Sequence, residues 1–406
     1  MKPIVLLLST YPAITPRHGG QVRLSNIADS YAKAGFQVEH MAIYEPEGYN
    51  SQPRGKRDIP FPSNSPYRKF RGKVVPLIND LLSGAFAAAE DGCFTDVCNR
   101  LPAQINAIHV EQPWLWPLAV KIRKQPAFKN ASLIYGSQNI EAPLKTEILE
   151  TYNVDKSDIQ NIEAEICHLE KSASKEADIT IAVTTSDLQI LTQWGAKKAI
   201  LASNGIAPWK ASVESLAQWE QRLPKAPWAL YIASAHPPNF TGFAQCFGNS
   251  LACIPPDTRL VVAGSVCDHL YQQLAQSQWN QLNTSRIELL GVLSDEDLAA
   301  VKTLAHAFVL PIPHGGGSNI KAAEALYSGA YVIGTKAAFR GFEQHIALPG
   351  ITASDNPNKF VSALRSALVK PRLAVNKENK SELGWAQCLA IIPATLQQLL
   401  KGASIK

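Results

Sequence analysis

The stretch PIPHGGGSNIKAAEALYSGAYVIGT, residues 311–335, sets three consecutive glycines between an apolar run and a helical pattern. The apolar run AFVLPI, residues 307–312, has the composition of a buried strand, and AYVIGT repeats that composition after the helical pattern. Glycines let a backbone approach a ligand closely, and the first amides of a helix, together with its dipole, favour an anion. The stretch therefore predicts a strand–loop–helix unit with a phosphate at its turn.

The predicted helix carries two charged residues next to this loop. We expect it to run from about Asn319 to Ser328, with Gly329 ending it. Lys321 and Glu324 then project from one face. A cation beside phosphates and a carboxylate that accepts hydrogen bonds from both ribose hydroxyls suit a nucleotide. The alternative is a glycine-rich turn that serves packing alone, with Lys321 and Glu324 as a solvated pair.

Composition indicates a globular protein of two domains. The chain has 406 residues, of which 46% are hydrophobic and 18% charged, enough for two substantial cores. Its formal charge of +5 is modest for this length and does not indicate nucleic-acid binding. Seven scattered cysteines without a CxxC pair fit a reduced cytoplasm better than a disulfide framework or a zinc site. The N-terminal apolar run IVLLLST is too short for a signal peptide or a membrane span, so we expect a cytoplasmic protein, with a peripheral contact at the inner face of the membrane left open.

Strand and helix patterns alternate twice along the chain, which predicts an α/β protein with parallel sheets. The first set starts with IVLLLST, followed by a helix whose Leu24, Ile27 and Tyr31 share one face. The second set starts with ALYIASA at residue 229. We expect two Rossmann-like domains that face each other across a cleft, where ligands bind outside the carboxyl ends of the strands. The expected boundaries are a first domain at 1–205, a linker at 206–227, a second domain at 228–380, and one C-terminal helix within 381–406 that packs back on the first domain.

Residues 46–73 interrupt the alternation with five prolines and seven Lys or Arg residues. We expect a long, basic, mobile loop. One interpretation is a solvated loop. The other is a segment that steers an anionic acceptor or a membrane surface, because cations clustered with Phe61, Tyr67 and Phe70 suit an interface.

The motifs also resemble a known family. The C-terminal signature, residues 291–343, reads GVLSDEDLAAVKTLAHAFVLPIPHGGGSNIKAAEALYSGAYVIGTKAAFRGFE and is similar to that of family 4-type glycosyltransferases, the glycosyl transferases group 1, which have the GT-B fold and use nucleotide-sugar donors. Five further pieces resemble the family's motifs in the same order: HGGQVR, AGFQVE, SQNIEA, SNGI and PPNFTGF.

This resemblance implies a role for each matching residue. Glu324 would bind the donor ribose, Lys321 and the backbone of 316–320 the diphosphate, and Gly19 and Gly20 the donor phosphates from the first domain. Arg23 would reach the donor phosphate or an anionic acceptor, unless it is a surface arginine. The implied donor-binding residues are Gly19, Gly20, Arg23, Asn239, Gly315, Gly316, Gly317, Ser318, Asn319, Ile320, Lys321 and Glu324, and the acceptor-side pair is Asn139 and Glu141.

The chain departs from the family's pattern at two places. Many retaining members carry a second glutamate eight residues before the ribose ligand, where this chain has Gly316. The usual Arg and Lys pair in the first loop of the second domain is replaced by His236 and Asn239. Lys321, backbone amides or a bound metal would then neutralise the leaving diphosphate. We infer no metal-dependent site of the other glycosyltransferase fold and expect no cofactor.

We therefore expect a glycosyltransferase that moves a sugar from a UDP- or GDP-sugar to a saccharide or lipid-linked acceptor, with retention of configuration, in surface polysaccharide or glycoconjugate biosynthesis. If a base is needed, the candidates are His18 and His109, with Glu111 behind them. His314, which precedes the glycines, is the third candidate catalytic residue and would touch the donor sugar or phosphate. An oxidoreductase is disfavoured because no G-x-G-x-x-G follows the first strand of either domain. A GT-B sugar-nucleotide epimerase or a non-catalytic nucleotide-sugar-binding module stays open as the alternative.

Overall fold

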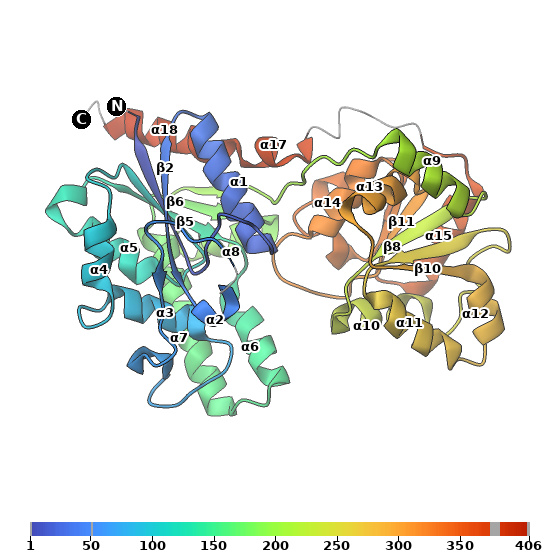
Figure 1. The fold of residues 1–406 in the computed structure, drawn as a ribbon, viewed down its shortest axis with the longest axis horizontal. Coiled ribbons are helices and arrows are strands. Elements are labelled where there is room, and N and C mark those ends of the chain that lie inside the picture. Colours follow the sequence, from blue (N-terminus) through green and yellow to red (C-terminus); the bar gives the residue numbers. More distant parts are fainter. Residues whose placement is uncertain (1, 50–51, 374–381, 404–406) are drawn as a thin grey trace. The chain divides into compact units, whose positions relative to one another are not determined.

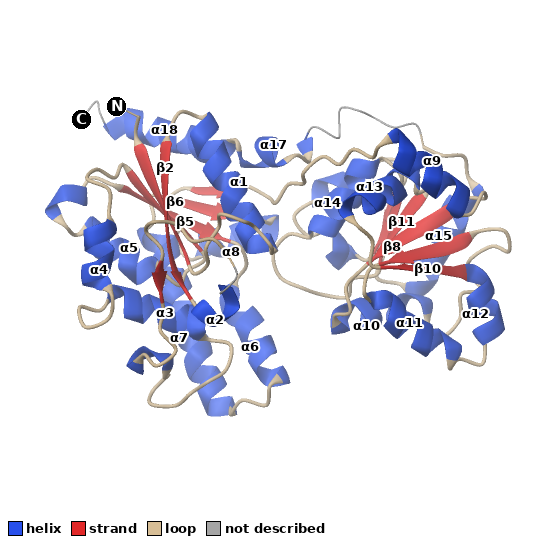
Figure 2. Cartoon of the chain, in the orientation of Figure 1, coloured by secondary structure: helices blue, strands red, loops and turns tan. Residues whose placement is uncertain are grey.

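The computed structural model describes residues 2–49, 52–373 and 382–403 (Figure 1). It divides into two compact units, Met1–Asn204 with Cys388–Lys406, and Gly205–Gln387. Each unit is a parallel sheet with helices on both faces (Figure 2). This confirms the predicted fold class of two Rossmann-like α/β domains.

The first unit is built on a seven-stranded sheet of order β3-β2-β1-β4-β5-β6-β7. Apolar residues fill both faces of its central strands, because helices cover both sides of a parallel sheet. The strands are β1 Ile4–Ser9, β2 Gln37–Tyr44, β3 Ile59–Pro60, β4 Ala107–Glu111, β5 Ser132–Ser137, β6 Ile179–Ala182 and β7 Ala199–Leu201. The helices are α1 Gly19–Lys33, α2 Pro46–Tyr49, α3 Asn79–Ala88, α4 Phe94–Arg100, α5 Trp116–Arg123, α6 Glu141–Thr151, α7 Lys156–Glu176, α8 Thr185–Gln193 and α18 Ile391–Ala403, with short 3₁₀ turns at Pro66–Arg68 and Pro126–Phe128.

The second unit has a six-stranded sheet of order β10-β9-β8-β11-β12-β13. Its strands are β8 Trp228–Ile232, β9 Arg259–Ala263, β10 Ile287–Gly291, β11 Ala307–Leu310, β12 Tyr331–Gly334 and β13 Ile351–Ala353. Its helices are α9 Val213–Arg222, α10 Pro237–Phe247, α11 Val266–Ala275, α12 Asn280–Arg286, α13 Asp295–Leu304, α14 Ile320–Ser328 and α15 Pro357–Val369, with 3₁₀ turns at Lys336–Phe339 and Glu343–His345. The short helix α17, Trp385–Leu389, spans the boundary between the units.

Strand order marks where each sheet should bind a ligand. In the first sheet, the chain adds strands to one side from β1 to β3 and then to the other side from β4 to β7, so the strand order switches between β1 and β4. In the second sheet, the same switch lies between β8 and β11. Loops leave the carboxyl ends of these neighbouring strands in opposite directions, which opens a crevice between them. The loops after β1 and β4, and those after β8 and β11, are therefore the places to look for a site.

Residues 206–227 are part of the second unit rather than a plain linker. They contain α9, which begins after Ser212, whose side chain accepts a hydrogen bond from the backbone N–H of Ser215. The helix packs on α13 through the buried Trp219, whose Nε1 donates to Asp297 Oδ1 at 2.8 Å. The prolines and tryptophans on either side of this one helix hid its pattern in the sequence.

The described part of the C-terminal segment is divided between α17 and α18, where one helix was predicted. The first ends at Leu389 and the second begins at Ile391, and position 381 lies outside the described residues. Pro393 accounts for the break, because it lacks the N–H that would bond to the carbonyl of Leu389 in one continuous helix. α18 packs on α1, where Gln397 Nε2 donates to the carbonyl of Ala34 at 2.9 Å.

The basic segment 46–73 is built into the first unit where it is described. Phe61 and Phe70 are buried in the core, and Tyr67 packs against it. Arg68 pairs with Glu45 and Glu47 at 2.9 and 3.1 Å. The expectation that these aromatic side chains face an interface is therefore wrong, because they serve the hydrophobic core.

Candidate functional site

In the second unit, the glycine loop connects β11 to α14 as the sequence predicts. α14 begins at Ile320 with Asn319 as its N-cap, and Gly329 ends it in the left-handed conformation. Gly317 has φ +59°, a conformation that favours glycine. Asn319 Nδ2 also donates to the carbonyl of Ala338 at 2.7 Å, which fixes the loop to the segment after β12. The first amides of α14 thus stand at the carboxyl edge of the sheet.

Lys321 bridges the two loops that meet at the β8/β11 crevice. Its Nζ donates to Asn239 Oδ1 at 3.0 Å, and Asn239 lies in the first turn of α10, after β8. Burial lowers the pKa of Lys321, and the neighbouring carboxylate of Glu324 opposes that shift. The structure thus brings Asn239, Lys321 and Glu324 together, as the resemblance implies.

Glu324 is held by a lysine that the sequence does not single out. Lys302, on α13, is buried, and its Nζ lies 3.1 Å from Glu324 Oε1 and 4.2 Å from the centre of the Trp209 ring. The Glu324 side chain keeps 31% of its surface exposed, so it can still accept from a ligand. Lys302 occupies a polar position of an amphipathic helix, where sequence alone predicts a solvated side chain.

A second cation that sequence reasoning missed lies beside the glycines. Arg340 Nε donates to the carbonyl of Gly317 at 3.2 Å. A Cβ added at Gly315 would lie 2.6 Å from Arg340 Nη2, so the absence of a side chain there admits the guanidinium. His314, Gly315 and Gly316 are exposed. Arg340 therefore supplies positive charge near the glycine loop.

In the first unit, His18 and the two glycines lie where β1 leads into α1. His18 is the N-cap of α1, and its Nε2 lies 3.2 Å from Tyr49 Oη. It keeps much of its surface exposed, and the groups packed around its ring lower its pKa by desolvation. α1 begins at Gly19, so Gly19 and Gly20 place the first amides of this helix at the carboxyl edge of β1.

Gly20 is required by a neighbouring side chain, whereas Gly19 is not. A Cβ at Gly20 would lie 2.8 Å from Tyr11 Oη, and at Gly19 it would meet nothing within 4 Å. We expect Gly20→Ala to displace the buried Tyr11 and to lower the free energy of unfolding by about 1–3 kcal/mol. Gly19→Ala is the matched control and should be neutral or slightly stabilising. Chemical denaturation measures both, and equal stability of the two variants would contradict this packing.

Arg23 and His109 belong to a buried charge network, not to an open site. Arg23 is 1% exposed, its Nε lies 3.3 Å from Glu111 Oε2, and its Nη1 donates to Ala202 O and to Asn204 Oδ1. His109 is fully buried, with Nε2 3.0 Å from Glu111 Oε1 and Nδ1 3.0 Å from the hydroxyl of Tyr31. Both side chains are closed off from solvent. The prediction of a surface or phosphate-binding Arg23 and of a catalytic His109 is corrected accordingly, because both are enclosed.

This network sets the ionisation of Glu111. Burial alone raises the pKa of Glu111, but Arg23, His109 and Gln138 together lower it to about 2. Gln138 Nε2 donates to Glu111 Oε2 at 2.8 Å and to Tyr11 Oη at 2.9 Å, so it joins the buried network to the loop after β1. Arg23 and His109 thus act through Glu111 and Gln138 on the position of that loop.

Asn139 and Glu141 lie at the start of α6, where Glu141 is 4% exposed. Glu141 Oε1 accepts from Asn139 Nδ2 at 3.2 Å and from Gln112 Nε2 at 3.1 Å. Burial raises the pKa of Glu141 and raises that of Glu170 to about 7, and Glu170 accepts from the backbone N–H of Glu141 at 2.7 Å. Glu141 is thus mainly an internal hydrogen-bonding group.

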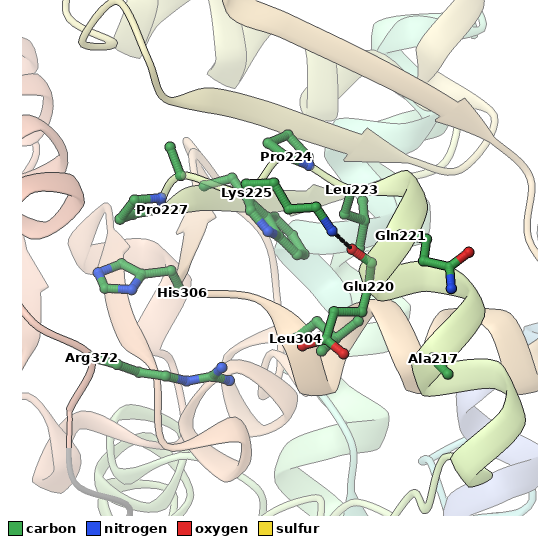
Figure 3. A pocket seen from close by; sticks show the side chains of 12 residues that line it. Ala217, Glu220, Gln221, Leu223, Pro224, Lys225, Pro227, Leu304, His306 and Arg372 are labelled. Atoms are coloured by element: carbon green, nitrogen blue, oxygen red, sulfur yellow. Dashed lines mark hydrogen bonds between the residues drawn. The ribbon is translucent and has the colours of Figure 1, made fainter.

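A pocket of about 480 Å³ in the second unit lies at the wrong edge of the sheet for a donor (Figure 3). Trp228, which begins β8, and His306, which precedes β11, line it together with Lys225 and Arg372. Lys225 Nζ donates a hydrogen bond to the carbonyl of Glu220 at 2.6 Å. Ligands of such sheets bind at the carboxyl ends of the strands, so we do not assign the donor here.

The described residues contain neither a metal-binding cluster nor a membrane-spanning helix. No group of three or more His, Cys, Asp or Glu side chains among them is placed to hold a metal ion. Within the same part of the chain, no helix is long and apolar enough to cross a bilayer.

Comparisons with known proteins agree with this geometry. Residues 226–370 match the family model of glycosyl transferases group 1. Sucrose-phosphate synthase from Thermosynechococcus elongatus is 15% identical with a TM-score of 0.69, over 99% of this chain and 100% of that one. The α,α-trehalose 6-phosphate synthase from Burkholderia multivorans is 14% identical with a TM-score of 0.66, over 100% and 98%. Anabaena Alr3699/HepE in complex with UDP and glucose is 15% identical with a TM-score of 0.53, over the whole of both chains. No curated protein sequence matches the chain.

Proposed function

We propose, from the premise that residues 226–370 are a glycosyl transferases group 1 domain on a GT-B fold, that this chain moves a hexose from a UDP- or GDP-sugar to a saccharide or lipid-linked acceptor. The observation that carries the proposal is the meeting of Asn239, Lys321 and Glu324 at the β8/β11 crevice, beside the N-terminus of α14. The presence of UDP and glucose in the structure of Alr3699/HepE supports a UDP-sugar as donor.

In this proposal the second unit binds the nucleotide part of the donor. The Glu324 carboxylate accepts hydrogen bonds from the ribose hydroxyls, and the first amides of α14 with Lys321 contact the diphosphate. Gly19 and Gly20, at the start of α1, contribute backbone amides to the donor phosphates from the first unit. His314, exposed at the start of the glycine loop, is the candidate contact to the donor sugar.

The chemistry follows from the charges that develop. Sugar transfer passes through an oxocarbenium-like state while negative charge grows on the leaving diphosphate. Gly316 stands where many retaining relatives carry a carboxylate, so stabilisation of that charge falls to the amides, Lys321 and Arg340. We propose retention, with the leaving phosphate oxygen accepting the acceptor proton on the same face. His18 is the alternative base if configuration is inverted.

The test of this function is nucleotide release by the full chain from a panel of UDP- and GDP-sugars, with and without added saccharide acceptors. Acceptor-dependent release is expected from one donor, and NMR of the anomeric proton of the product then reports retention or inversion. EDTA should leave the rate unchanged, since we propose no resident metal. Binding of a donor without release would favour a non-catalytic module, and a changed sugar released as the nucleotide would favour an epimerase.

We expect Lys302 to hold the Glu324 carboxylate in position rather than to bind the donor itself. Lys302→Met removes the cation beside Glu324 Oε1, whereas Lys302→Arg keeps it. We expect Lys302→Met to weaken nucleotide binding about tenfold, because the carboxylate loses the partner that holds it in place, a hydrogen bond of the charged kind worth about 1.5–3 kcal/mol. Calorimetric titration with UDP and GDP measures this. Unchanged affinity in Lys302→Met, or equal losses in both variants, would count against a positioning role.

We also propose that the exposed cations of segment 52–73, among them Lys56, Lys69 and Arg71, provide the peripheral membrane contact and that the protein works in the cytoplasm, where its free cysteines stay reduced. Sedimentation with anionic vesicles tests the contact. Binding that survives charge reversal of these three residues would contradict it.

A further inference from the structure

Residues 335–342 follow β12 and form a closely packed segment beside the glycine loop. The 3₁₀ turn in this segment begins after Thr335, whose hydroxyl accepts from the N–H of Ala338 at 3.2 Å. Phe339 and Phe342 are buried in the core of the second unit. A Cβ added at Gly334 would lie 2.8 Å from the Phe339 ring, so this ring packs directly on the end of β12. The backbone of segment 335–342 is therefore well anchored.

The Arg340 side chain extends from this segment to the glycine loop. Its Nε donates to the carbonyl of Gly317 at 3.2 Å, and its Nη1 donates to the carbonyl of Ala337. The guanidinium thus joins a carbonyl of the loop to a carbonyl of the anchored segment. Gly315 has φ +148°, and a Cβ there would lie 3.3 Å from the central carbon of the guanidinium. A side chain at Gly315 would displace the guanidinium from this position.

Backbone contacts join the same two segments. The N–H of Asn319 donates to the carbonyl of Arg340 at 3.1 Å, and Asn319 Nδ2 donates to the carbonyl of Ala338 at 2.7 Å. Asn319 Oδ1 accepts from the N–H of Lys321 at 3.3 Å, at the start of α14. The N–H of Asn319 is therefore engaged inside the protein, and this residue shapes the end of the glycine loop.

The bond from Arg340 to Gly317 sets the orientation of one peptide group of the loop. In a planar trans peptide the C=O and the N–H point in opposite directions, so the N–H of Ser318 points away from the guanidinium. β8 and β12 lie on opposite sides of β11 in the sheet. The loop after β8 carries Asn239, which accepts from Lys321 Nζ. Arg340 and the Lys321–Asn239 pair therefore approach the glycine loop from different sides.

We infer that Arg340 is a positioning residue of the donor site, which holds the Gly317–Ser318 peptide with its N–H directed toward the donor diphosphate. This inference rests on the proposed glycosyltransferase function. The role requires more than charge, because a guanidinium is a planar fork that donates to two carbonyls in fixed directions. The ammonium of a lysine is a compact charge on a flexible stem and does not reproduce that geometry.

NMR titrations of the full chain test the inference by comparing UDP with uridine and GDP with guanosine. For the nucleotide that the unaltered chain binds, Arg340→Ala and Arg340→Lys should each weaken the diphosphate about tenfold. Both variants should leave the affinity for the nucleoside unchanged, because the proposed ribose contact is Glu324 and not the glycine loop. Thermal unfolding checks the fold of both variants.

Chemical rescue separates the lost guanidinium from a general disturbance of the loop. Guanidinium chloride, kept below the concentration that unfolds the protein, should restore the diphosphate affinity of Arg340→Ala. Sodium chloride at the same ionic strength should not restore it. Arg365→Ala removes an exposed arginine of α15 and is the matched control, for which nucleotide and nucleoside affinities should stay unchanged.

Diphosphate affinity equal to that of the unaltered chain in both Arg340 variants would overturn the inference alone. Equal losses for the diphosphate and the nucleoside would also overturn it, since the peptide orientation acts on phosphate contacts. Full affinity in Arg340→Lys would reduce Arg340 to a source of charge and would contradict a positioning role. If the unaltered chain bound neither nucleotide, the proposed donor site would be wrong and the inference would fall with it.

Discussion

Replacing Glu324 with glutamine is expected to weaken nucleotide-sugar binding about ten- to a hundredfold while the fold stays intact. The carboxylate can accept from two ribose hydroxyls at once, and hydrogen bonds to a charged group are worth about 1.5–3 kcal/mol. Glutamine keeps the shape and offers an amide oxygen to Lys302 Nζ, now 3.1 Å from Glu324 Oε1. It therefore tests the ligand contact with little risk to the fold, whereas Glu324→Ala would leave the buried Lys302 unpaired.

Calorimetric titration of the full chain with UDP, GDP and their sugars measures the effect, and thermal unfolding checks the fold. Glu343→Gln changes an exposed glutamate of the same unit and serves as the control. Donor affinity in Glu324→Gln equal to that in the control would remove the ribose assignment.

Replacing Arg23 with methionine is expected to destabilise the folded protein by about 3–5 kcal/mol at neutral pH, because it leaves the buried Glu111 carboxylate without its cation. The two side chains are 1% and 0% exposed, so water screens the ion pair little. Methionine retains much of the volume of the arginine stem. The loss should therefore report the missing charge rather than a cavity.

The pH dependence of this loss has a definite sign. In the native protein Glu111 has a pKa of about 2, below its ordinary value, so its contribution to stability is complete above the ordinary carboxylate range and is lost as the pH falls toward 2. Without Arg23, burial raises the pKa of Glu111, and folding takes up a proton at that carboxylate. The deficit of Arg23→Met should thus be largest at pH 8 and smaller at pH 5.

Urea denaturation at several pH values measures that trend. The double variant Arg23→Met/Glu111→Gln should be more stable at pH 8 than Arg23→Met alone, since the unpaired charge is then gone. If Arg23→Met lost less than about 1 kcal/mol of stability and the loss did not vary with pH, Arg23 and Glu111 would interact as weakly as an exposed ion pair, and the prediction would be wrong.

Much of this fold could be predicted from patterns among residues that are close together in the sequence. The approximate limits of α14 and its end at Gly329 depend on neighbours within a few residues, so the sequence predicts them. The cap of α13 by Ser294, which accepts from the N–H of Asp297 at 3.1 Å, is local in the same way. The alternation that predicted two parallel sheets likewise needs only the apolar runs.

Contacts between side chains that are far apart in the sequence could not be predicted. Arg23 and Glu111 are 88 positions apart, and nothing in either neighbourhood indicates that both side chains become buried together. Lys302 and Glu324 lie on different helices, and nothing near either residue in the sequence indicates that the two side chains pair. The burial of Phe61 could not be predicted either, because its proline-rich and basic neighbours are typical of an exposed loop.

The most direct test of the donor site is hydrogen–deuterium exchange of the full chain with and without saturating UDP-glucose, and again with GDP-mannose. We predict that one of these donors slows exchange in residues 314–324 and 236–239, where the amides at the start of α14 and the Lys321–Asn239 contact lie. Protection confined to the pocket around Trp228 and His306, or no protection with any nucleotide sugar that binds, would contradict the account.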